Sequence, residues 1–219
     1  MHTEKKLADD TLIISLPERT DRRQRVAALF SRENIPFRFV DGVRVTREEI
    51  TEKEISELYW APFKEEAGWD AYLKAAIGCK RAHIRCLQYG IEAGLDSLLI
   101  MEDDVALRDD WYPAFLRAYA DLPPGWLQLH LSAASIRPSL PVTPHLRRLT
   151  FACQATAILY SRDGIEAALN CSIHAKAEID WWMGLHLHPF GCSYIVEPPI
   201  TYQTGGYSDI CGTIRGETP

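Results

Sequence analysis

The stretch from Leu98 to Asp104 constrains this chain more than any other part of it. Four apolar residues in a row, 98–101, show no helical spacing and predict a short strand buried on both faces. Glu102, Asp103 and Asp104 follow where that strand leaves the sheet. Ligands of open α/β sheets bind beyond the carboxyl ends of strands, and a hard divalent cation holds crowded acids ionised. The stretch therefore predicts a metal site; the alternative is a solvated turn in which Asp103 or Asp104 caps the next segment.

The composition predicts a single folded domain. A length of 219 residues is enough for one sizeable core, and 47% hydrophobic and 25% charged residues are ordinary for a soluble protein. The net charge of −6 argues against a nucleic-acid partner, which needs a basic footprint. No apolar run is long enough to span a membrane, and the polar first ten residues lack a signal-peptide core, so we expect a cytoplasmic protein. The six cysteines form no C-x-x-C pair and are expected to be buried free thiols.

A β-α-β unit opens the chain. The pattern predicts strands at 11–16 and 35–40, with a helix from about 20 to 32 between them. Either Thr20 or Asp21 is expected to cap this helix. Arg22 and Arg25 lie three residues apart and so share a helix face, which by itself is expected to be a solvated basic face.

The remaining pattern continues the alternation of strands and helices. It predicts helices at 77–95, from Asp109 or Asp110, at 161–170 and opening at 178–182, and strands at 126–131, 152–160 and 193–196. Residues 46–74 are expected to form an excursion over the sheet edge, and 132–149 an irregular flap. Four aromatic residues of the excursion are expected either to pack or to line a sugar site: Trp60, Phe63, Trp69 and Tyr72. His83, at the edge of an apolar helix stripe, is expected to be a packing residue or a ligand.

Several motifs occur in a fixed order along the chain. They are a strand with Leu16-Pro17-x-Arg19 and an arginine-rich helix, Phe39-Val40-Asp41-Gly42, Gly78-Cys79-x-x-x-His83, Glu102-Asp103-Asp104, Asp180-Trp181-Trp182, and the tail from Gln203 to Ile210. In this order the chain resembles glycosyltransferase family 25, the family of lipo-oligosaccharide galactosyl- and glucosyltransferases and of procollagen galactosyltransferases. The resemblance implies an α/β fold of GT-A type, a Rossmann-like, mainly parallel sheet flanked by helices. It implies a single domain at 11–211, with a nucleotide-binding half at about 11–104, an acceptor half at about 105–211, and tails at 1–10 and 212–219.

The resemblance also implies a function. It is that of a metal-dependent inverting glycosyltransferase that moves galactose or glucose from a nucleotide sugar, UDP-galactose or UDP-glucose, to a hydroxyl of a glycan such as lipo-oligosaccharide. Glu102 and Asp104 would hold Mn²⁺ or Mg²⁺. Asp180 would be the base, with a helix cap or a further metal-side acid as alternatives. The implied donor-binding residues are Leu16, Pro17, Arg19, Arg22, Arg25, Asp41, Gly42, His83, Asp103, Gln203, Ser208 and Asp209. Such an enzyme would be cytoplasmic, in peripheral contact with the inner membrane.

The chain departs from the family pattern in two ways. Ala82 stands where the family usually has Ser, which removes a hydroxyl near the site, and the C-terminal extension of many relatives is missing. His186 and His188 alternate, so one of them is expected to face inward, as an extra ligand or in packing. Two other functional classes stay open: a non-catalytic homologue that binds a nucleotide sugar or a partner, and a metal-dependent hydrolase of phosphoesters or nucleotide sugars.

Overall fold

One mixed sheet of eight strands forms the centre of the computed structural model, which describes residues 4–58, 68–210 and 213–218. Its strands run in the order β2-β1-β3-β10-β5-β11-β8-β7. β1, β2 and β3 are mutually parallel, β10 is antiparallel to both of its neighbours, and β5 pairs parallel with β11. The bounds are β1 Asp10–Ser15, β2 Arg38–Asp41, β3 Ser97–Glu102, β5 Gln128–His130, β7 Leu140–Thr143, β8 Leu146–Arg148, β10 Ala157–Ser161 and β11 Ser193–Val196.

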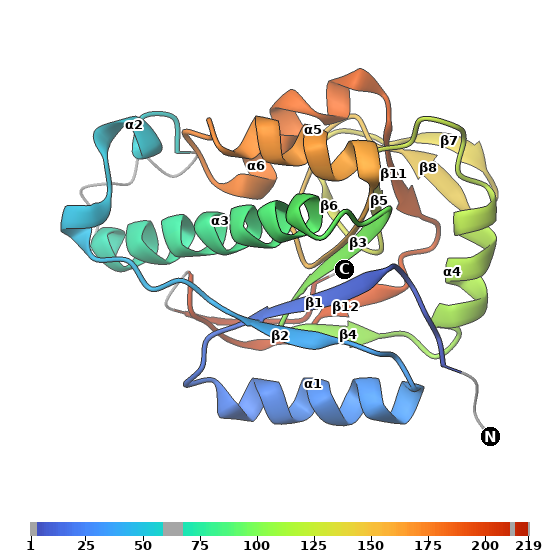
Figure 1. Cartoon of the computed structure of the whole chain (residues 1–219), viewed down its shortest axis with the longest axis horizontal. Helices are drawn as coiled ribbons and strands as arrows, with labels where there is room; N and C mark the ends of the chain where they lie inside the picture. The colour runs from blue at the N-terminus through green and yellow to red at the C-terminus, as the bar shows by residue number, and fades with distance from the viewer. Residues whose placement is uncertain (1–3, 59–67, 211–212, 219) are drawn as a thin grey trace.

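Helices cover both faces of this sheet. They are α1 Thr20–Glu33, α2 Glu52–Ile55, α3 Trp69–Glu92, α4 Trp111–Ala120, α5 Arg162–Ser172 and α6 Ile179–His186, with short 3₁₀ turns at Arg47–Glu49 and His188–Phe190. Figure 1 shows α1 on one side of β1 and β2, and α3, α5 and α6 on the other. Among the described residues, no helix is both long and apolar enough to cross a membrane.

The alternation along the strands explains the two helical layers. In β1, Ile13 points into a core shared with α1 and α4, whereas Leu12 and Ile14 point into a second core shared with α3, α5 and α6. Successive side chains of a strand face opposite sides, so a strand that is apolar throughout needs cover on both. β3 is buried in the same way, as its unbroken apolar run predicts.

The carboxyl ends of β1, β2 and β3 lie together. The parallel register pairs Ile14 with Glu102 and Ser15 with Asp41, so the loops that leave these three strands start at about the same level. Two small sheets lie next to this edge: β12 (Thr201–Gln203) pairs with β4 (Val105–Leu107), and β13 (Gly206–Ser208) pairs with β14 (Thr213–Arg215). The chain's C-terminal segment therefore returns to the loop that carries the three acids.

Several local predictions need correction. The first helix begins at Thr20, but Arg19 occupies the N-cap position without a side-chain cap bond, so neither Thr20 nor Asp21 caps it. α3 begins at Trp69 rather than at 77, because Leu73 and Ile77 pack together against Val45 and Ile50. The described residues of the segment 46–74 thus include the 3₁₀ turn Arg47–Glu49, α2 and the start of α3. Trp60 and Phe63 lie outside the described residues.

The segment 132–149 is also more regular than expected. It contains β6 (Ala134–Ser135), which pairs with β9 (Ala152–Cys153), and the hairpin β7-β8 at the edge of the main sheet. Three prolines hide this hairpin in the sequence, since proline lacks the N–H that a central strand requires. An edge strand tolerates Pro141, and there the hairpin forms.

At both ends of the chain, more residues belong to the fold than the predicted domain bounds include. Leu7 and Ala8, in the predicted N-terminal tail, are buried in the core. β14 lies within the predicted C-terminal tail, and Thr218 pairs with Gln203 of β12.

Candidate active site

Three consecutive acids lie at the end of β3: Glu102 is the last residue of the strand, and Asp103 and Asp104 follow it. The structure gives each acid a different environment. Asp103 is the paired one: its Oδ2 accepts a hydrogen bond from Ser15 Oγ at 2.7 Å, and its Oδ1 accepts one from Arg22 Nη1 at 2.7 Å. Its side chain is only 9% exposed. Because Asp103 is buried and accepts a hydrogen bond on each oxygen, it anchors the loop after β3 to β1 and to α1. It is not the cap of a solvated turn.

Two further residues, Arg25 and Thr204, fix the backbone of this loop. Arg25 donates from its guanidinium to the carbonyl oxygens of Asp103 and Val105, at 2.6 and 3.1 Å. Thr204 donates its backbone N–H and its hydroxyl to the carbonyl of Asp104. The loop is therefore held from α1 on one side and from the C-terminal segment on the other. Arg22 and Arg25, the two arginines that share a face of α1, both bind this loop: Arg22 through the Asp103 side chain and Arg25 through backbone carbonyls.

Asp104 has the opposite character to Asp103. Its Oδ1 is buried, and no described residue gives it a hydrogen bond. Burial, then repulsion from Glu102, raise the pKa of Asp104 to about 7, although Arg22 partly offsets them. A buried carboxylate oxygen without a donor is costly unless a cation binds it. Asp104 is thus the acid of this loop that most needs a ligand.

Glu102 lies between the acid loop and α3. Its Oε1 is 3.4 Å from His83 Nε2 and 3.4 Å from Cys79 Sγ. Burial raises the pKa of Glu102, but the contacts with His83 and Cys79 outweigh burial, and its pKa lies below the ordinary value. The side chain is 20% exposed, so Glu102 still reaches open space.

Asp180 is held in a fixed orientation at the start of α6. Its Oδ2 accepts the backbone N–H of Gln154 at 2.8 Å, and its Oδ1 accepts that of Trp181. Gln154 has a positive φ of 71°, a conformation uncommon for this residue type, and its N–H points at the carboxylate. Burial is the main cause of a raised pKa for Asp180, and the charges of Glu102 and Glu178 add to it. Glu178, not Asp180, occupies the N-cap position of α6.

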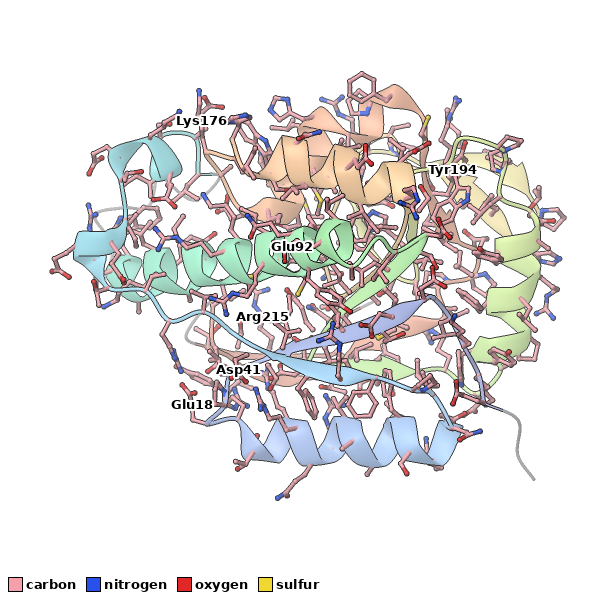
Figure 2. The ribbon with its side chains drawn as sticks, in the orientation of Figure 1. Glu18, Asp41, Glu92, Lys176, Tyr194 and Arg215 are labelled. Atoms are coloured by element: carbon pink, nitrogen blue, oxygen red, sulfur yellow. The ribbon has the colours of Figure 1, made fainter. Side chains whose placement is uncertain are left out.

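A cavity of about 1020 Å³ joins these groups. The acids that follow β3 line it on one side, and Asp180 and Trp181 line it on another. Val43 and Val45, in the loop after β2, add apolar surface to its wall. Glu18 pairs with Arg44, another lining residue, and Figure 2 shows Glu18 and Asp41 at this end of the sheet. The cavity lies where the carboxyl ends of parallel strands are expected to bind a ligand.

Most of the residues predicted for the site line this cavity. They are Leu16, Arg22, Gly42, Glu102, Asp103, Asp104, Asp180, Gln203, Ser208 and Asp209. Five others do not: Pro17, Arg19, Arg25, Asp41 and His83. Of these, Arg19 forms an ion pair with Asp209, Asp41 pairs with Arg23, and His83 lies buried behind Glu102. Arg19, Arg25 and His83 therefore support lining residues from behind.

The structure also places, relative to the site, the aromatic, alanine and histidine residues that the sequence singled out. Tyr72 lines the cavity and stacks on Trp69, with ring centroids 5.7 Å apart. Ala82 is fully buried and also lines it. Neither His186 nor His188 is among the described lining residues: His186 packs on Trp182, and His188 is buried beside His130.

Sequence reasoning missed several lining or supporting residues. Ser15 bonds Asp103, Gln154 orients Asp180, and Thr204 fixes the acid loop. None of them belongs to a charged motif, so only the folded chain reveals them. Cys79 does carry a signal, because it precedes His83 by four residues on a helix and so shares its face.

An acid-lined cavity at the carboxyl ends of parallel strands, in a mixed α/β sheet, is placed where open α/β proteins bind their ligands. The model described as "Glycosyltransferase family 25 (LPS biosynthesis protein)" matches residues 8–122, more than half of the chain. The chain belongs to glycosyltransferase family 25. It is a glycosyltransferase, an enzyme class that acts on a nucleotide-sugar donor and an acceptor.

Two solved structures that match this chain are distant from it in sequence. The crystal structure of A197 from STIV aligns over 94% of this chain and 92% of that chain, with 10% identity and a TM-score of 0.44. A glycosyltransferase involved in the glycosylation of the major capsid of PBCV-1 aligns over 72% of this chain and 61% of that chain, with 13% identity and a TM-score of 0.35. Both scores are low, so neither similarity bears on the substrates of this chain. No curated protein matches it.

Proposed function

We propose that this glycosyltransferase is a metal-dependent, inverting hexosyltransferase of GT-A type. It would transfer galactose or glucose from a UDP-sugar to a hydroxyl of a glycan acceptor such as lipo-oligosaccharide. The description of the family, LPS biosynthesis, supports an acceptor of this class and an enzyme at the cytoplasmic face of a membrane, in peripheral contact with it. One sheet that continues through both halves of the chain supports the GT-A assignment.

The observation that carries this proposal is the buried, unbonded oxygen of Asp104 beside Glu102. The carboxylates of Glu102, at the end of β3, and of Asp104, in the loop that follows, line a large cavity, and Oδ1 of Asp104 lacks a donor among the described residues. A divalent cation with hard oxygen preference would relieve both the missing bond and the repulsion. The residues therefore fit Mn²⁺ or Mg²⁺, held by Glu102 and Asp104. When bound, the cation would stabilise the negative charge that develops on the departing nucleoside diphosphate.

The donor half of the cavity supports a nucleotide substrate. The loop after β2 supplies Gly42, Val43 and Val45, an apolar wall against which a base can pack. A Cβ at Gly42 would approach Leu16 Cδ2 to 2.9 Å, so glycine lets the two loops meet closely. Arg215, from the C-terminal segment, also lines the cavity and is a cation available to a phosphate group. We propose that the nucleotide's base packs near the loop after β2 and that its diphosphate lies near Glu102 and Asp104.

Asp180 is the proposed base on the acceptor side. An inverting transfer needs a group that takes the proton of the attacking hydroxyl on the face opposite the leaving group. Two backbone N–H groups orient the Asp180 carboxylate, and its raised pKa makes it a stronger base than a solvated aspartate. We propose that an Asp180 oxygen accepts this proton as the new glycosidic bond forms. Trp181, beside it in the cavity, would exclude water from the reacting atoms.

A thermal-shift experiment tests the donor site. The wild-type chain is heated with UDP-, GDP-, CMP- and dTDP-sugars, each with Mn²⁺ or with a chelator, because binding to the native state raises the melting temperature. We expect a Mn²⁺-dependent shift with UDP-sugars that Asp104→Asn abolishes and Asp110→Asn, at the start of α4, retains. An Asp104→Asn variant with an unchanged shift would contradict the metal assignment.

A second experiment tests the proposed base and the reaction class. Asp180→Asn should keep the Mn²⁺-dependent shift but lose sugar transfer, since only the proton acceptor is removed. Near-normal turnover would remove Asp180 from this role. Wild-type enzyme that releases free sugar at full rate without any acceptor would instead be a hydrolase.

A further inference from the structure

A sulfur, a nitrogen and an oxygen ligand meet between α3 and the end of β3. Cys79 and His83 lie four residues apart on α3 and so project from the same face. Glu102 Oε1 is 3.4 Å from both Cys79 Sγ and His83 Nε2, and the three ligand atoms all lie within 4.8 Å of one another. Among the described residues, this is the group of Cys, His and acidic side chains close enough to share one ion.

Two of the three distances between the ligand atoms fit a tetrahedral ion with bonds of ordinary length. Zinc bonds of about 2.0 to 2.3 Å to nitrogen, oxygen and sulfur place neighbouring tetrahedral ligands roughly 3.3 to 3.7 Å apart. The two distances of 3.4 Å from Glu102 already lie in this range. A thiolate and an imidazole are ligands that Zn²⁺ or Co²⁺ prefers, whereas Mn²⁺ and Mg²⁺ prefer oxygen.

The position of the cluster leaves one coordination site open. Cys79 and Glu102 both line the cavity, whereas His83 is 1% exposed and closes the site from behind. Three protein ligands with a fourth position toward a cavity is the arrangement of zinc sites that bind water or substrate. His83 Nδ1 has no hydrogen-bond partner among the described residues, so no contact there prevents Nε2 from presenting its lone pair.

We propose that Cys79, His83 and Glu102 form a Zn²⁺ site that competes with the donor-binding cation, because the two sites share Glu102. The competition rests on the proposed function, in which Glu102 and Asp104 hold Mn²⁺; the Zn²⁺ site itself does not. On binding, the Cys79 thiol loses its proton to solvent and the sulfur forms a bond to zinc, with no change of oxidation state. Linkage requires that each ion weaken the binding of the other by the same factor. Zn²⁺ is therefore an inhibitor of donor binding.

Cobalt gives a direct test of the sulfur ligand. The full chain, stripped of metal with a chelator, is titrated with Co²⁺ while the thiolate-to-cobalt charge-transfer absorption is recorded. We expect this band in the wild-type chain and in two control variants, Cys86→Ser and Cys153→Ser. Cys86 lies on α3, as Cys79 does, and Cys153 lines the same cavity. Cys79→Ser should abolish it, and His83→Gln should weaken Co²⁺ binding by roughly tenfold or more. No band in the wild-type chain, or a band that survives in Cys79→Ser, would overturn the site.

A second titration separates this proposal from the proposed function. Increasing Mn²⁺ should raise the Co²⁺ concentration needed for half-maximal absorption in the wild-type chain, and much less so in Asp104→Asn. A Co²⁺ midpoint that ignores Mn²⁺ in the wild-type chain would overturn the shared use of Glu102. Failure of the proposed function has a different signature, the absence of any Mn²⁺-dependent nucleotide shift while the cobalt band remains. Circular dichroism and the melting temperature of Cys79→Ser and His83→Gln report whether both variants fold.

Discussion

Replacing Asp104 by asparagine should stabilise the metal-free protein while it removes metal-dependent donor binding. One oxygen of the Asp104 carboxylate, Oδ1, is buried and lacks a donor among the described residues, and Glu102 repels the charge of this carboxylate. Asparagine has nearly the same shape but carries no charge, so it removes both the desolvation cost and the repulsion. A residue that binds a ligand and destabilises the empty protein is expected at a functional site.

The size of the effect follows from the pKa. The ordinary pKa of 3.8 rises to about 7 in the folded chain. One pKa unit is worth about 1.4 kcal/mol, so the ionised side chain lowers the free energy of unfolding by up to about 4 kcal/mol. Because Glu102 shares the repulsion and the new amide needs its own partner, we expect a gain of about 2 kcal/mol at neutral pH. This corresponds to a melting temperature higher by roughly 5 °C.

The pH dependence has a definite sign. The folded pKa is raised, so between pH 3.8 and about 7 the folded chain binds more protons at Asp104 than the unfolded chain. The free energy of unfolding of the wild type therefore falls, through this group, as the pH rises across that window. The difference between Asp104→Asn and wild type should be near zero at pH 4 and reach its full value at about pH 7.5.

Urea unfolding in the presence of a chelator measures this difference. Asp103→Asn is the matched control: its carboxylate bonds Ser15 and Arg22, so this variant should lose about 2 to 3 kcal/mol. Added Mn²⁺ should stabilise the wild type and leave Asp104→Asn unchanged. An Asp104→Asn variant less stable than wild type at pH 7.5, or equally stabilised at pH 4 and 7.5, would refute this account.

Three further predictions concern the frame around the site. Ser15→Ala removes the hydroxyl bonded to Asp103 and should lower the free energy of unfolding in urea by about 1.5 to 3 kcal/mol; a loss no larger than that of exposed Ser31→Ala would contradict it. In Gly78→Ala the new Cβ would lie 2.2 Å from the carbonyl oxygen of Val43, so we expect a cost of about 1 to 3 kcal/mol by thermal unfolding. Gly216→Ala, with no atom within 4 Å, should cost much less, and equal costs would count against the steric argument. Burial lowers the pKa of His188 from 6.5 to about 4, so between these values the unfolded chain binds more protons at this group than the folded chain. The free energy of unfolding should therefore be unaffected by this group above pH 6.5 and fall below it, by about 2 kcal/mol at pH 5. An unfolding free energy that falls equally in His188→Gln between pH 7 and 5 would show that other groups cause the decline.

Much of the scaffold could be predicted because local patterns determine it. The apolar run at 98–101 requires cover on both faces, and the structure buries β3 between two helical layers. The first β-α-β unit follows from periodicity and from the residues that interrupt it. Predictions failed where context outweighed local preference. The hairpin β7-β8 contains prolines that only an edge strand tolerates, and α3 extends toward Trp69 because a small hydrophobic cluster stabilises its first turns.

The sequence by itself determined the position of the acids in the fold and the family to which the chain belongs. The order of its motifs identifies the family. The acidic triplet at the end of a buried strand predicts where the site lies, because ligands of such sheets bind beyond the carboxyl ends of the strands.

Only the tertiary structure decided what each acid does. Three adjacent carboxylates are chemically alike in the sequence. In the fold, Arg22 neutralises Asp103 and Ser15 donates a hydrogen bond to it, whereas Asp104 Oδ1 lacks a donor among the described residues and Glu102 faces Cys79 and His83. Those partners come from β1, α1 and α3, and the opposite wall comes from residues beyond 150. Burial and charge at each oxygen depend on groups far along the chain, and no local pattern encodes them.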